Sequence, residues 1–310
     1  MPDVSIIIIN YNVLGLLDNC LQSLVYHIKG VTFEVIVVDN KSEEGNVEEI
    51  INKYSGVRLI KNNTNVGFAA ANNMALNFAA GKYILFLNND VLFIDNVIKK
   101  VFDYAENHSD KIFTGIQLLN ADKSKQESVV NFPSVWNAIT ENFFLYKIFK
   151  RSEIFNKYYQ NEIELSEPTE VDVIRGAFMF CPKDEIMKLN GFDERFFFYS
   201  EETDLCYRFK KGGGKIVFLP NLKILHYGGA AADRDIWFKY KNQATGKIQF
   251  YQKHFYGLNF VLVILIHWIG LLMRSVIFSF AGLISINKNL IVKGYYFFKQ
   301  LFVYPKNRFN

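Results

Sequence analysis

The stretch Tyr83-Ile84-Leu85-Phe86-Leu87-Asn88-Asn89-Asp90 decides the fold of this chain. Its unbroken apolar and aromatic run, preceded by Gly81-Lys82, is typical of a central parallel strand that is buried on both faces. The run stops at two amides and a carboxylate. Because ligands of open α/β sheets bind outside the carboxyl ends of the strands, these polar side chains lie where chemistry is expected. A lone carboxylate after a strand is also a common helix N-cap or turn former, so this stretch alone leaves both interpretations open.

The residues before this strand alternate between strand-like and helix-like segments. Apolar runs predict strands at Val4–Asn10, Glu34–Asp39 and Val57–Lys61, and helical spacing predicts helices at Val13–Val25 and Gly67–Phe78. Such an order predicts an α/β fold with a mostly parallel central sheet and right-handed crossovers.

The ends of these strands indicate a nucleotide site without a dinucleotide fingerprint. The turn Asn10-Tyr11-Asn12-Val13-Leu14-Gly15 lacks the Gly-x-Gly-x-x-Gly pattern that lets backbone approach a pyrophosphate. Asp39 ends the second strand, where a carboxylate can accept hydrogen bonds from a base N–H or a ribose hydroxyl. A mononucleotide diphosphate whose charge is neutralised by a metal ion fits both observations.

A polar cluster, Asn62–Asn73, opens the helix that precedes Tyr83. Its Gly67 allows backbone to come close to a ligand. An ordinary N-cap on an alanine-rich packing helix explains the same pattern.

The chain after Asp90 is mixed. We predict helices at Asp95–Glu106 and Lys183–Leu189, and an aromatic helix-like segment at Trp136–Phe155 within the irregular residues 120–168. We predict strands at Lys111–Gly115, Lys215–Leu219 and Leu222–His226. Val171–Phe180 is predicted as a strand pair or one long strand. Insertions such as 120–168 commonly form acceptor-binding surface, although surface loops also vary without a functional reason.

An aromatic segment leads directly into a carboxylate cluster. Phe196-Phe197-Phe198-Tyr199 precedes Glu201 and Glu202, which begin a helix that ends at Gly212-Gly213-Gly214. Aromatic walls raise the pKa of a nearby acid by desolvation and offer a stacking surface for a sugar ring. The helix dipole alone also favours acids at this position, and a lone His226 at a strand end is more often a packing or capping residue than a ligand.

The composition is that of a globular protein. Half of the 310 residues are hydrophobic, enough for one large core or two smaller ones. Cys20, Cys181 and Cys206 form no pair at metal or redox spacing, and an odd count suits a reducing compartment. The N-terminus enters a strand directly, with no basic segment or cleavage site. We therefore expect cytoplasmic residence.

The C-terminal tail is basic and aromatic. From Arg234 onward eleven Lys and Arg residues accompany one acid, Asp235, so the rest of the chain is net acidic. This distribution favours an anionic membrane surface as the partner, with nucleic acid as the rival target. The uncharged residues His254–Met273 barely reach the length of a membrane span, and Ser275–Asn287 is too short. Lysines on both flanks favour a segment lying in the cytoplasmic leaflet over a clean span, and a buried helical hairpin within an oligomer is the alternative.

Taken in order, these pieces resemble the inverting GT-A-type family 2 glycosyltransferases, in particular the bacterial enzymes that include rhamnosyltransferases of surface-polysaccharide synthesis. The resemblance covers about residues 1–230 and rests on seven pieces whose order makes it specific: Val4–Asn12, Glu34–Ser42, Asn65–Asn73, Tyr83–Asp90, Gly176–Met179, Gly191–Leu205 and His226. It implies a GT-A (Rossmann-like nucleotide-diphospho-sugar transferase) catalytic domain at residues 1–232, with a donor half to about 115 and an acceptor half after it. A helical membrane-associating region at 233–310 follows.

The resemblance also implies a metal site. Asn88-Asn89-Asp90 takes the place of the family's Asp-x-Asp motif, with Asp90 as the ligand of a Mg²⁺ or Mn²⁺ ion that bridges the donor diphosphate. Other branches carry a carboxylate at position 88, so Asn88 implies modest metal affinity. His226 matches a histidine that joins the metal shell in some relatives.

The remaining implied roles concern the donor and the base. Asp39 would recognise the nucleobase, Asn65 and Gly67 would lie along the nucleoside, and the other donor-site residues implied are Asn10, Asn12 and Asn89. The Glu201-Glu202 pair matches a Glu-Asp motif whose second residue is the general base. Glu202 is therefore the first choice for the base, and Glu201 is a competitor.

We therefore expect a membrane-associated inverting glycosyltransferase, peripheral on the inner face of the cell membrane or with a single span. It would move a sugar from a dTDP- or UDP-linked donor to a glycan or lipid-linked acceptor in bacterial surface polysaccharide synthesis, without nucleic acid and with homo-oligomerisation possible. A sugar nucleotidyltransferase is one alternative, although its glycine-rich phosphate loop is absent. A non-catalytic glycan-binding protein on the same fold is the other.

Overall fold

The computed structural model describes residues 1–108, 111–150, 152, 154–156, 165–228 and 235–304. The chain divides into two compact units. Unit 1 comprises residues 1–131, 163–197 and 201–231, and unit 2 comprises residues 132–162, 198–200 and 232–310. The predicted domain boundary after residue 232 lies outside the described residues and stays a prediction.

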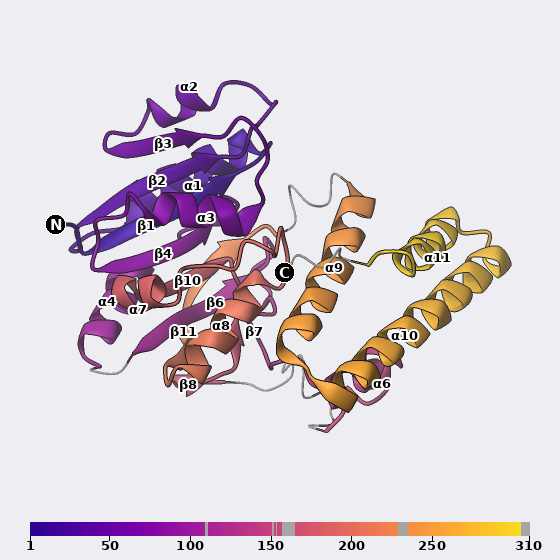
Figure 1. The fold of residues 1–310 in the computed structure, drawn as a ribbon. Helices are drawn as coiled ribbons and strands as arrows, with labels where there is room; N and C mark the ends of the chain where they lie inside the picture. The colour runs from indigo at the N-terminus through magenta and orange to yellow at the C-terminus, as the bar shows by residue number, and fades with distance from the viewer. Residues whose placement is uncertain (109–110, 151, 153, 157–164, 229–234, 305–310) are drawn as a thin grey trace. The chain divides into compact units, whose positions relative to one another are not determined.

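Unit 1 is built around one large sheet (Figure 1). Among the described residues its strands are β1 (Val4–Asn10), β2 (Phe33–Asp39), β3 (Val57–Lys61), β4 (Tyr83–Asn88), β5 (Val91–Leu92), β6 (Ile112–Leu119), β8 (Thr169–Glu170), β10 (Phe178–Pro182) and β11 (Lys215–His226). They follow the order β3-β2-β1-β4-β10-β6-β11-β5, and β8 pairs with β11. Strands β3, β2, β1 and β4 are parallel, and β10 runs antiparallel to both β4 and β6. The predicted mostly parallel sheet is confirmed.

Helices pack on both faces of this sheet because its strands are apolar on both sides. The helices are α1 (Leu14–His27), α2 (Val47–Ile51), α3 (Phe68–Leu76), α4 (Val97–Glu106), α7 (Lys183–Lys188) and α8 (Glu201–Lys211). Ile6 and Ile8 of β1 belong to one buried cluster with α1 and α4. Phe86 of β4 lies outside that cluster and contacts Phe192, which also contacts Phe68 at the start of α3.

The register of the parallel strands brings the polar strand ends to one edge. Asn10 pairs with Asp39 across β1 and β2, and Ile9 pairs with Asn88 across β1 and β4. His226 arrives from the far end of the sequence because β11 pairs antiparallel with β5, where it lies opposite Val91. The candidate site residues of β1, β2, β4 and β11 therefore belong to strand ends of a single sheet.

Several predicted elements have different bounds. The two strands predicted at Lys215–Leu219 and Leu222–His226 are one strand, β11, with a register shift between Leu219 and Lys223. Pro220 lacks the N–H that a regular ladder needs at this point. The strand predicted at Lys111–Gly115 continues to Leu119, and Val171–Phe180 is a strand pair, β9 (Val173–Ile174) and β10. Strand β9 pairs with β7 (Val129–Val130) in a separate two-stranded sheet.

Unit 2 is helical in its described residues. It contains α5 (Val135–Asn142), α6 (Leu145–Ile148), α9 (Ile236–His254), α10 (Gly257–Ile284) and α11 (Lys288–Gln300). The helix-like segment predicted at Trp136–Phe155 is broken at Phe144, whose φ of 58° is left-handed and ends α5.

Helix α10 corrects the prediction for the tail. The two uncharged segments that were expected to be separated at Arg274 form one helix of 28 residues. Arg274 does not interrupt it because its guanidinium donates to the backbone oxygen of Glu141 and to Asn142 Oδ1, both at 2.6 Å. By length and composition α10 could cross a membrane, and among the described helices it alone meets that test.

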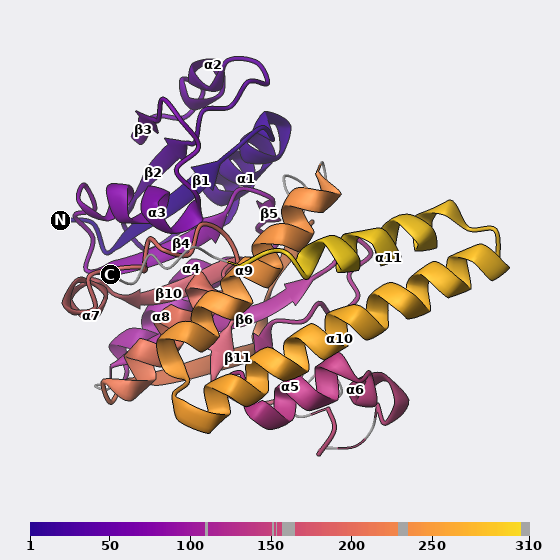
Figure 2. The same cartoon turned by 45° about the vertical axis from the view of Figure 1, so that its right-hand side comes forward.

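Helices α10 and α11 form a tight hairpin (Figure 2). Asn287 accepts hydrogen bonds from the backbone N–H groups of Asn289 and Leu290 and so caps α11. Gly294 permits the close approach of the two helices, since a Cβ there would lie 2.3 Å from Ser279 Oγ.

Candidate functional site

A hydrogen-bonded group joins the ends of β1 and β2. Asn10 Nδ2 donates to Asp39 Oδ1 at 2.9 Å and to Ser42 Oγ at 3.0 Å. The hydroxyl and the backbone N–H of Ser42 donate to the two oxygens of Asp39 at 2.6 and 3.0 Å. Asp39 is therefore held in one orientation, with lone pairs left to accept from a base or a sugar. Ser42 was not predicted as a site residue, and the signal for it is the Asp-x-x-Ser spacing of an Asx-type turn.

Asn12 and Asn89 extend this group. The backbone N–H of Asn12 donates to Ser42 Oγ at 2.9 Å, and Asn12 Oδ1 accepts from Glu43 N–H at 2.7 Å. Asn12 has a φ of 56°, which an Asn tolerates better than most residues. Asn89 Nδ2 donates to Asn10 Oδ1 at 2.9 Å and so links β4 to β1. The three amides are fixed by one another and by the turn after β2.

The segment before α3 is tied to the same edge. Asn65 Oδ1 accepts from Gly67 N–H at 3.0 Å, and Gly67 O accepts from Asn40 Nδ2 at 3.1 Å. Gly67 has a φ of 89°, and a Cβ there would lie 2.6 Å from Phe197 O. The close approach that the glycine allows is thus made by the backbone of Phe197, which also accepts from Phe68 N–H at 2.8 Å. Chain packing is sufficient to explain why position 67 is glycine.

Asp90 and His226 face each other across β5 and β11. Asp90 is 6% exposed, and its Oδ1 is buried without a hydrogen bond from any described residue. His226 Nε2 lies 3.2 Å from that oxygen, and Asn88 Nδ2 lies 3.3 Å from the same nitrogen. His226 Nδ1 lies 2.6 Å from Gln126 Oε1.

This geometry fits a cation. The Gln126 oxygen is an acceptor, so Nδ1 carries the hydrogen and a neutral imidazole presents the Nε2 lone pair toward Asp90. A lone pair and a carboxylate oxygen at 3.2 Å repel unless a proton or a metal ion lies with them. Within the described residues no group of three or more His, Cys, Asp or Glu side chains could hold a metal ion. The pair would therefore need further ligands from a bound diphosphate and water, which Mg²⁺ and Mn²⁺ accept.

Glu201 and Glu202 begin α8 directly after an unusual backbone turn. Tyr199 and Ser200 have φ values of 72° and 71°. Left-handed non-glycine residues are uncommon, and such outliers cluster at functional sites. Both glutamates are buried at 5% and 8% exposure.

The two glutamates have different surroundings. Arg175 Nη1 lies 3.7 Å from Glu202 Oε1, whereas Glu201 Oε2 is buried with no hydrogen-bond partner among the described residues. Burial, and then the charge of Glu202, raise the pKa of Glu201 well above its usual range. Glu201 is therefore the member of the pair whose protonated form is favoured, and Glu202 is the member that has a cation beside it.

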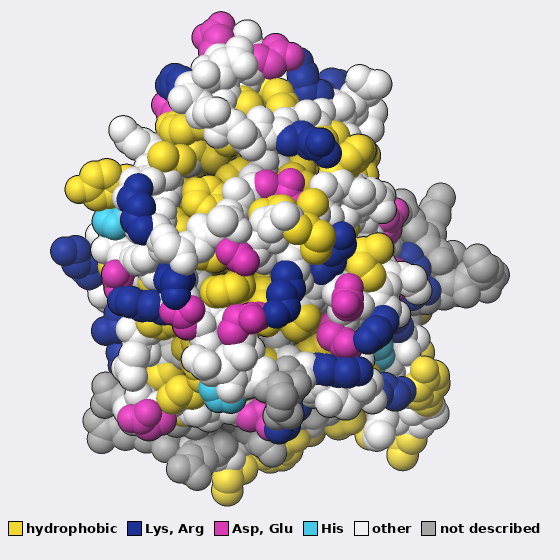
Figure 3. Space-filling view, turned by 90° about the vertical axis from the view of Figure 1, so that its left-hand side faces the viewer, with side chains coloured by type: hydrophobic (Ala, Val, Ile, Leu, Met, Phe, Trp, Pro, Cys, Tyr) yellow, Lys and Arg dark blue, Asp and Glu magenta, His cyan; other side chains and the backbone are white. Residues whose placement is uncertain are grey.

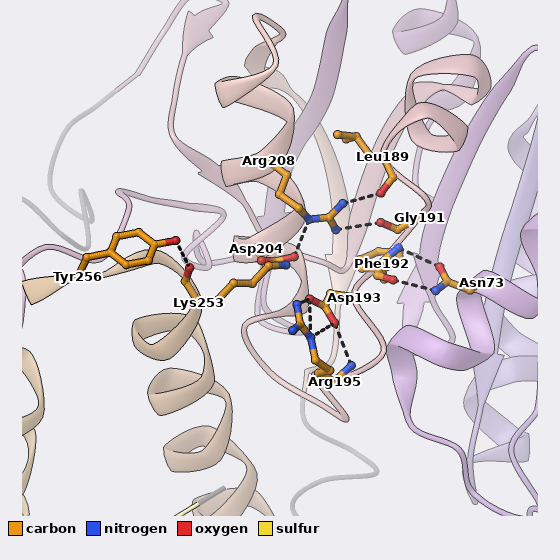
Figure 4. Close-up of polar contacts among 10 residues, drawn as sticks. All are labelled: Asn73, Leu189, Gly191, Phe192, Asp193, Arg195, Asp204, Arg208, Lys253 and Tyr256. Atoms are coloured by element: carbon orange, nitrogen blue, oxygen red, sulfur yellow. Dashed lines mark hydrogen bonds and ion pairs between the residues drawn. The ribbon is translucent and has the colours of Figure 1, made fainter. Parts of the chain in front are cut away.

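The loop that precedes α8 is clamped from two sides (Figure 4). Arg208 of α8 donates from Nε to Asp204 Oδ2 at 2.7 Å and from its two Nη atoms to the backbone oxygens of Leu189 and Gly191, both at 2.8 Å. Asn73 of α3 donates to Phe192 O at 2.8 Å and accepts from Phe192 N–H at 2.9 Å. Because Asp204 and Asn73 come from different helices, the start of this loop has a defined position.

A continuous set of contacts joins the two ends of the candidate site. It runs from Asp90 through His226 to Gln126, and from the next residue, Glu127, through Arg175 to Glu202. Gln126, Glu127 and Arg175 were not predicted as site residues. Their only sequence signal is polarity beside the irregular segment and beside Gly176.

Known sequences similar to this chain include glycosyltransferases. Residues 5–179 match the sequence profile described as Glycosyl transferase family 2. The Rhamnosyltransferase WbbL of Escherichia coli (strain K12) is 28% identical over 203 residues, which cover 63% of this chain and 73% of that protein. The N-acetylglucosaminyl-diphospho-decaprenol L-rhamnosyltransferase of Mycobacterium tuberculosis (strain ATCC 25618 / H37Rv) is 26% identical over 216 residues, covering 65% and 68%.

Two solved structures share the fold. The mannosyltransferase PcManGT from Pyrobaculum calidifontis, in complex with GDP-Man and Mn²⁺, aligns with a TM-score of 0.57 at 14% identity and covers 97% of this chain and 86% of its own. GalNAc-T7 with UDP, GalNAc and Mn²⁺ aligns with a TM-score of 0.55 at 14% identity over 78% of this chain. The aligned part spans about half the length of GalNAc-T7 (47%). The predicted GT-A fold is confirmed.

Proposed function

The chain belongs to glycosyl transferase family 2, and from this membership we propose that it is an inverting transferase that moves a sugar from a nucleoside-diphosphate donor to a glycan or lipid-linked acceptor. The observation that carries the proposal is a set of contacts. It joins Asp90 and His226, the two residues that could hold a metal ion, to the carboxylate of Glu202. Transfer to an acceptor hydroxyl needs both parts. One neutralises charge on the leaving group, and the other removes a proton.

Each residue has a role in this mechanism. Asp39, held by Asn10 and Ser42, would accept a hydrogen bond from the nucleobase or ribose. Asp90 and His226 would hold a Mg²⁺ or Mn²⁺ ion, which when bound would neutralise negative charge on the diphosphate.

Glu202 would take the proton of the acceptor hydroxyl while that oxygen attacks the anomeric carbon from the side opposite the diphosphate. This in-line attack inverts the anomeric centre. Glu201 is the poorer candidate for the base because its raised pKa favours the protonated form.

We propose a dTDP- or UDP-linked donor and a lipid-linked acceptor of bacterial surface polysaccharide, and one structural neighbour is described with UDP. One relative is described as acting on N-acetylglucosaminyl-diphospho-decaprenol. Incubation of the purified chain with Mn²⁺ and a panel of nucleotide sugars tests the proposal when N-acetylglucosaminyl-diphospho-polyprenol and glycan acceptors are present. We expect nucleoside diphosphate release that depends on the acceptor. Absence of both release and transfer across the panel would refute the proposal.

We further propose that unit 2 holds the chain on an anionic membrane. Large apolar residues are exposed at helical spacing along α10, among them Leu258, Val261, Leu265, Ile269, Leu272, Val276, Phe280 and Leu283. Its buried residues include the polar His267 and Ser275 and the small Gly270 and Gly282. An apolar exterior around a polar interior suits lipid better than water. Lysines near the helix ends, among them Lys253 and Lys288, complement anionic headgroups.

The charge distribution on one face of the molecule does not favour nucleic acid as the anionic partner. On the face drawn in Figure 3, Lys and Arg side chains are interspersed with Asp and Glu side chains among the described residues. A nucleic acid backbone is bound by a continuous basic patch.

Sedimentation with vesicles of anionic or zwitterionic lipid tests the membrane proposal. We expect the chain to pellet with anionic vesicles and the Leu265→Glu, Leu272→Glu double variant to remain in solution. Met187→Glu is the matched control, because Met187 is exposed on α7 of unit 1 and should not contribute. Equal pelleting of all three proteins would refute the proposal.

A further inference from the structure

We propose that two consecutive residues, Gln126 and Glu127, are positioning residues that serve the two ends of the transfer site. Gln126 would orient His226 toward Asp90, and Glu127 would hold Arg175 against Glu202. This inference rests on the proposed function and deepens it, because it assigns the alignment of both ends to one short segment of the irregular region.

The backbone of this segment is fixed before its side chains are considered. Gln126 N–H donates to Leu118 O at 2.9 Å, and Gln126 O accepts from Gln117 Nε2 at 2.9 Å. Two residues later, Ser128 O accepts from Arg175 N–H at 3.0 Å, where β7 begins its pairing with β9. Successive side chains of an extended segment point to opposite sides, so adjacent residues can reach different parts of a site.

The amide of Gln126 has a defined orientation. Its Nε2 donates to Asn120 Oδ1 at 3.1 Å, which leaves Oε1 to face His226 Nδ1 at 2.6 Å. An acceptor at Nδ1 selects the tautomer whose Nε2 carries the lone pair, which could bind a cation beside Asp90 in place of its contact with Asn88 Nδ2. The Gln126 amide has little room to move toward Gly228, since a Cβ on Gly228 would lie 3.2 Å from Gln126 Nε2.

Glu127 acts on the other end through Arg175. Its Oε1 accepts from Arg175 Nη2, and Arg175 Nη1 lies 3.7 Å from Glu202 Oε1. A guanidinium can hold two carboxylates at once because its donors form a rigid planar fork. The other titratable groups that influence or are influenced by Glu202 are Glu201 beside it and Cys206 one turn further along α8. Arg175 is the cation of this set, and its guanidinium lies against the Glu202 carboxylate, so its position fixes the charge that faces Glu202.

The test compares Gln126→Leu with Glu127→Ala, and uses Lys125→Ala as the control because Lys125 is the exposed neighbour in the same segment. One readout is Mn²⁺ binding in the presence of UDP, measured from the free Mn²⁺ signal by electron paramagnetic resonance. The other is kcat for sugar transfer, measured over a range of Mn²⁺ concentrations. We expect Gln126→Leu to weaken Mn²⁺ binding by about 10- to 100-fold and to raise the Mn²⁺ concentration that transfer requires by the same factor.

We expect the opposite pattern for Glu127→Ala. Mn²⁺ binding should be unchanged, and kcat should fall at every Mn²⁺ concentration because Arg175 is no longer held against Glu202. Equal effects of both variants on both readouts, or wild-type behaviour in both, would overturn the inference. A wild-type chain that transfers no sugar would refute the proposed function instead, and the Mn²⁺ measurement would still decide the role of Gln126.

Discussion

The pair Glu201 and Glu202 allows one prediction to be made with its own internal control. Replacement of either by Gln preserves the shape of the side chain and removes its ability to act as a carboxylate. Since the raised pKa of Glu201 favours its protonated form, we expect Glu201→Gln to keep turnover within a few-fold of wild type. Glu202→Gln removes the proposed base and should lower kcat by about 10²–10⁴, or about 3–5 kcal/mol in the activation free energy.

The same pair predicts how stability depends on pH. The raised pKa of Glu201 means that the folded chain keeps a proton that the unfolded chain releases above about pH 4.3, the usual pKa of Glu. The stability that neutral Glu201 contributes is therefore complete below that pH, and it is lost as the pH rises toward the folded pKa. The free energy of unfolding should fall by about 1.4 kcal/mol per pH unit in this window for one proton. Glu201→Gln should lack this slope.

Two assays decide the prediction. Initial rates of nucleoside diphosphate release give kcat for each variant, and urea unfolding at several pH values above 4.3 gives the slope. Donor binding should survive in both variants because neither side chain contacts the group around Asp39 in the structure. A Glu201→Gln enzyme as impaired as Glu202→Gln, or one that retains the pH slope of wild type, would show that the proton is on the other glutamate.

Three further predictions concern the metal, the backbone and the helical unit. Asp90→Asn should raise the dissociation constant of Mn²⁺ with UDP by about tenfold or more, which is about 1.4 kcal/mol. Calorimetric titration measures this constant, and an unchanged affinity would contradict the prediction. Gly67→Ala should lower the free energy of unfolding by about 2–5 kcal/mol, because a left-handed backbone and the carbonyl of Phe197 both oppose a Cβ. Urea unfolding measures this, and a loss below about 1 kcal/mol would contradict it. Lys247→Met removes the ammonium group that lies 2.6 Å from the carboxylate of Glu141. This should lower the free energy of unfolding by about 3 kcal/mol, measured as a lower thermal midpoint. An unchanged midpoint would mean that water replaces the lysine.

Much of the donor side could be predicted from local pattern. Apolar runs such as Val4–Asn10 and Tyr83–Leu87 have the strand bounds that were predicted to within one residue, because a strand buried on both faces has few other conformations available. The polar residues after those strands then share an edge as a consequence of parallel pairing. The helix that begins at Glu201 and ends before the glycines was predicted for a similar reason.

Other features depended on contacts that local pattern does not contain. Arg274 was expected to divide the tail, and α10 continues through it because α5, more than a hundred residues earlier, supplies acceptors for its guanidinium. Gly67 was expected to approach a ligand, and the structure assigns that space to Phe197. In both cases the conformation that is most stable depends on residues that are distant in the sequence and adjacent in the fold.

By itself, then, the amino-acid order determined the sheet, the edge at which its polar strand ends meet and the pairing of two glutamates at a helix start. Only the tertiary structure decided that burial raises the pKa of Glu201, that Arg175 lies beside Glu202, and that Gln126 and Glu127 reach His226 and Arg175. The physical reason is that secondary structure follows from periodicities of two and 3.6 residues along the chain, whereas burial and hydrogen-bond partners are set by segments that meet from 48 to 100 residues apart.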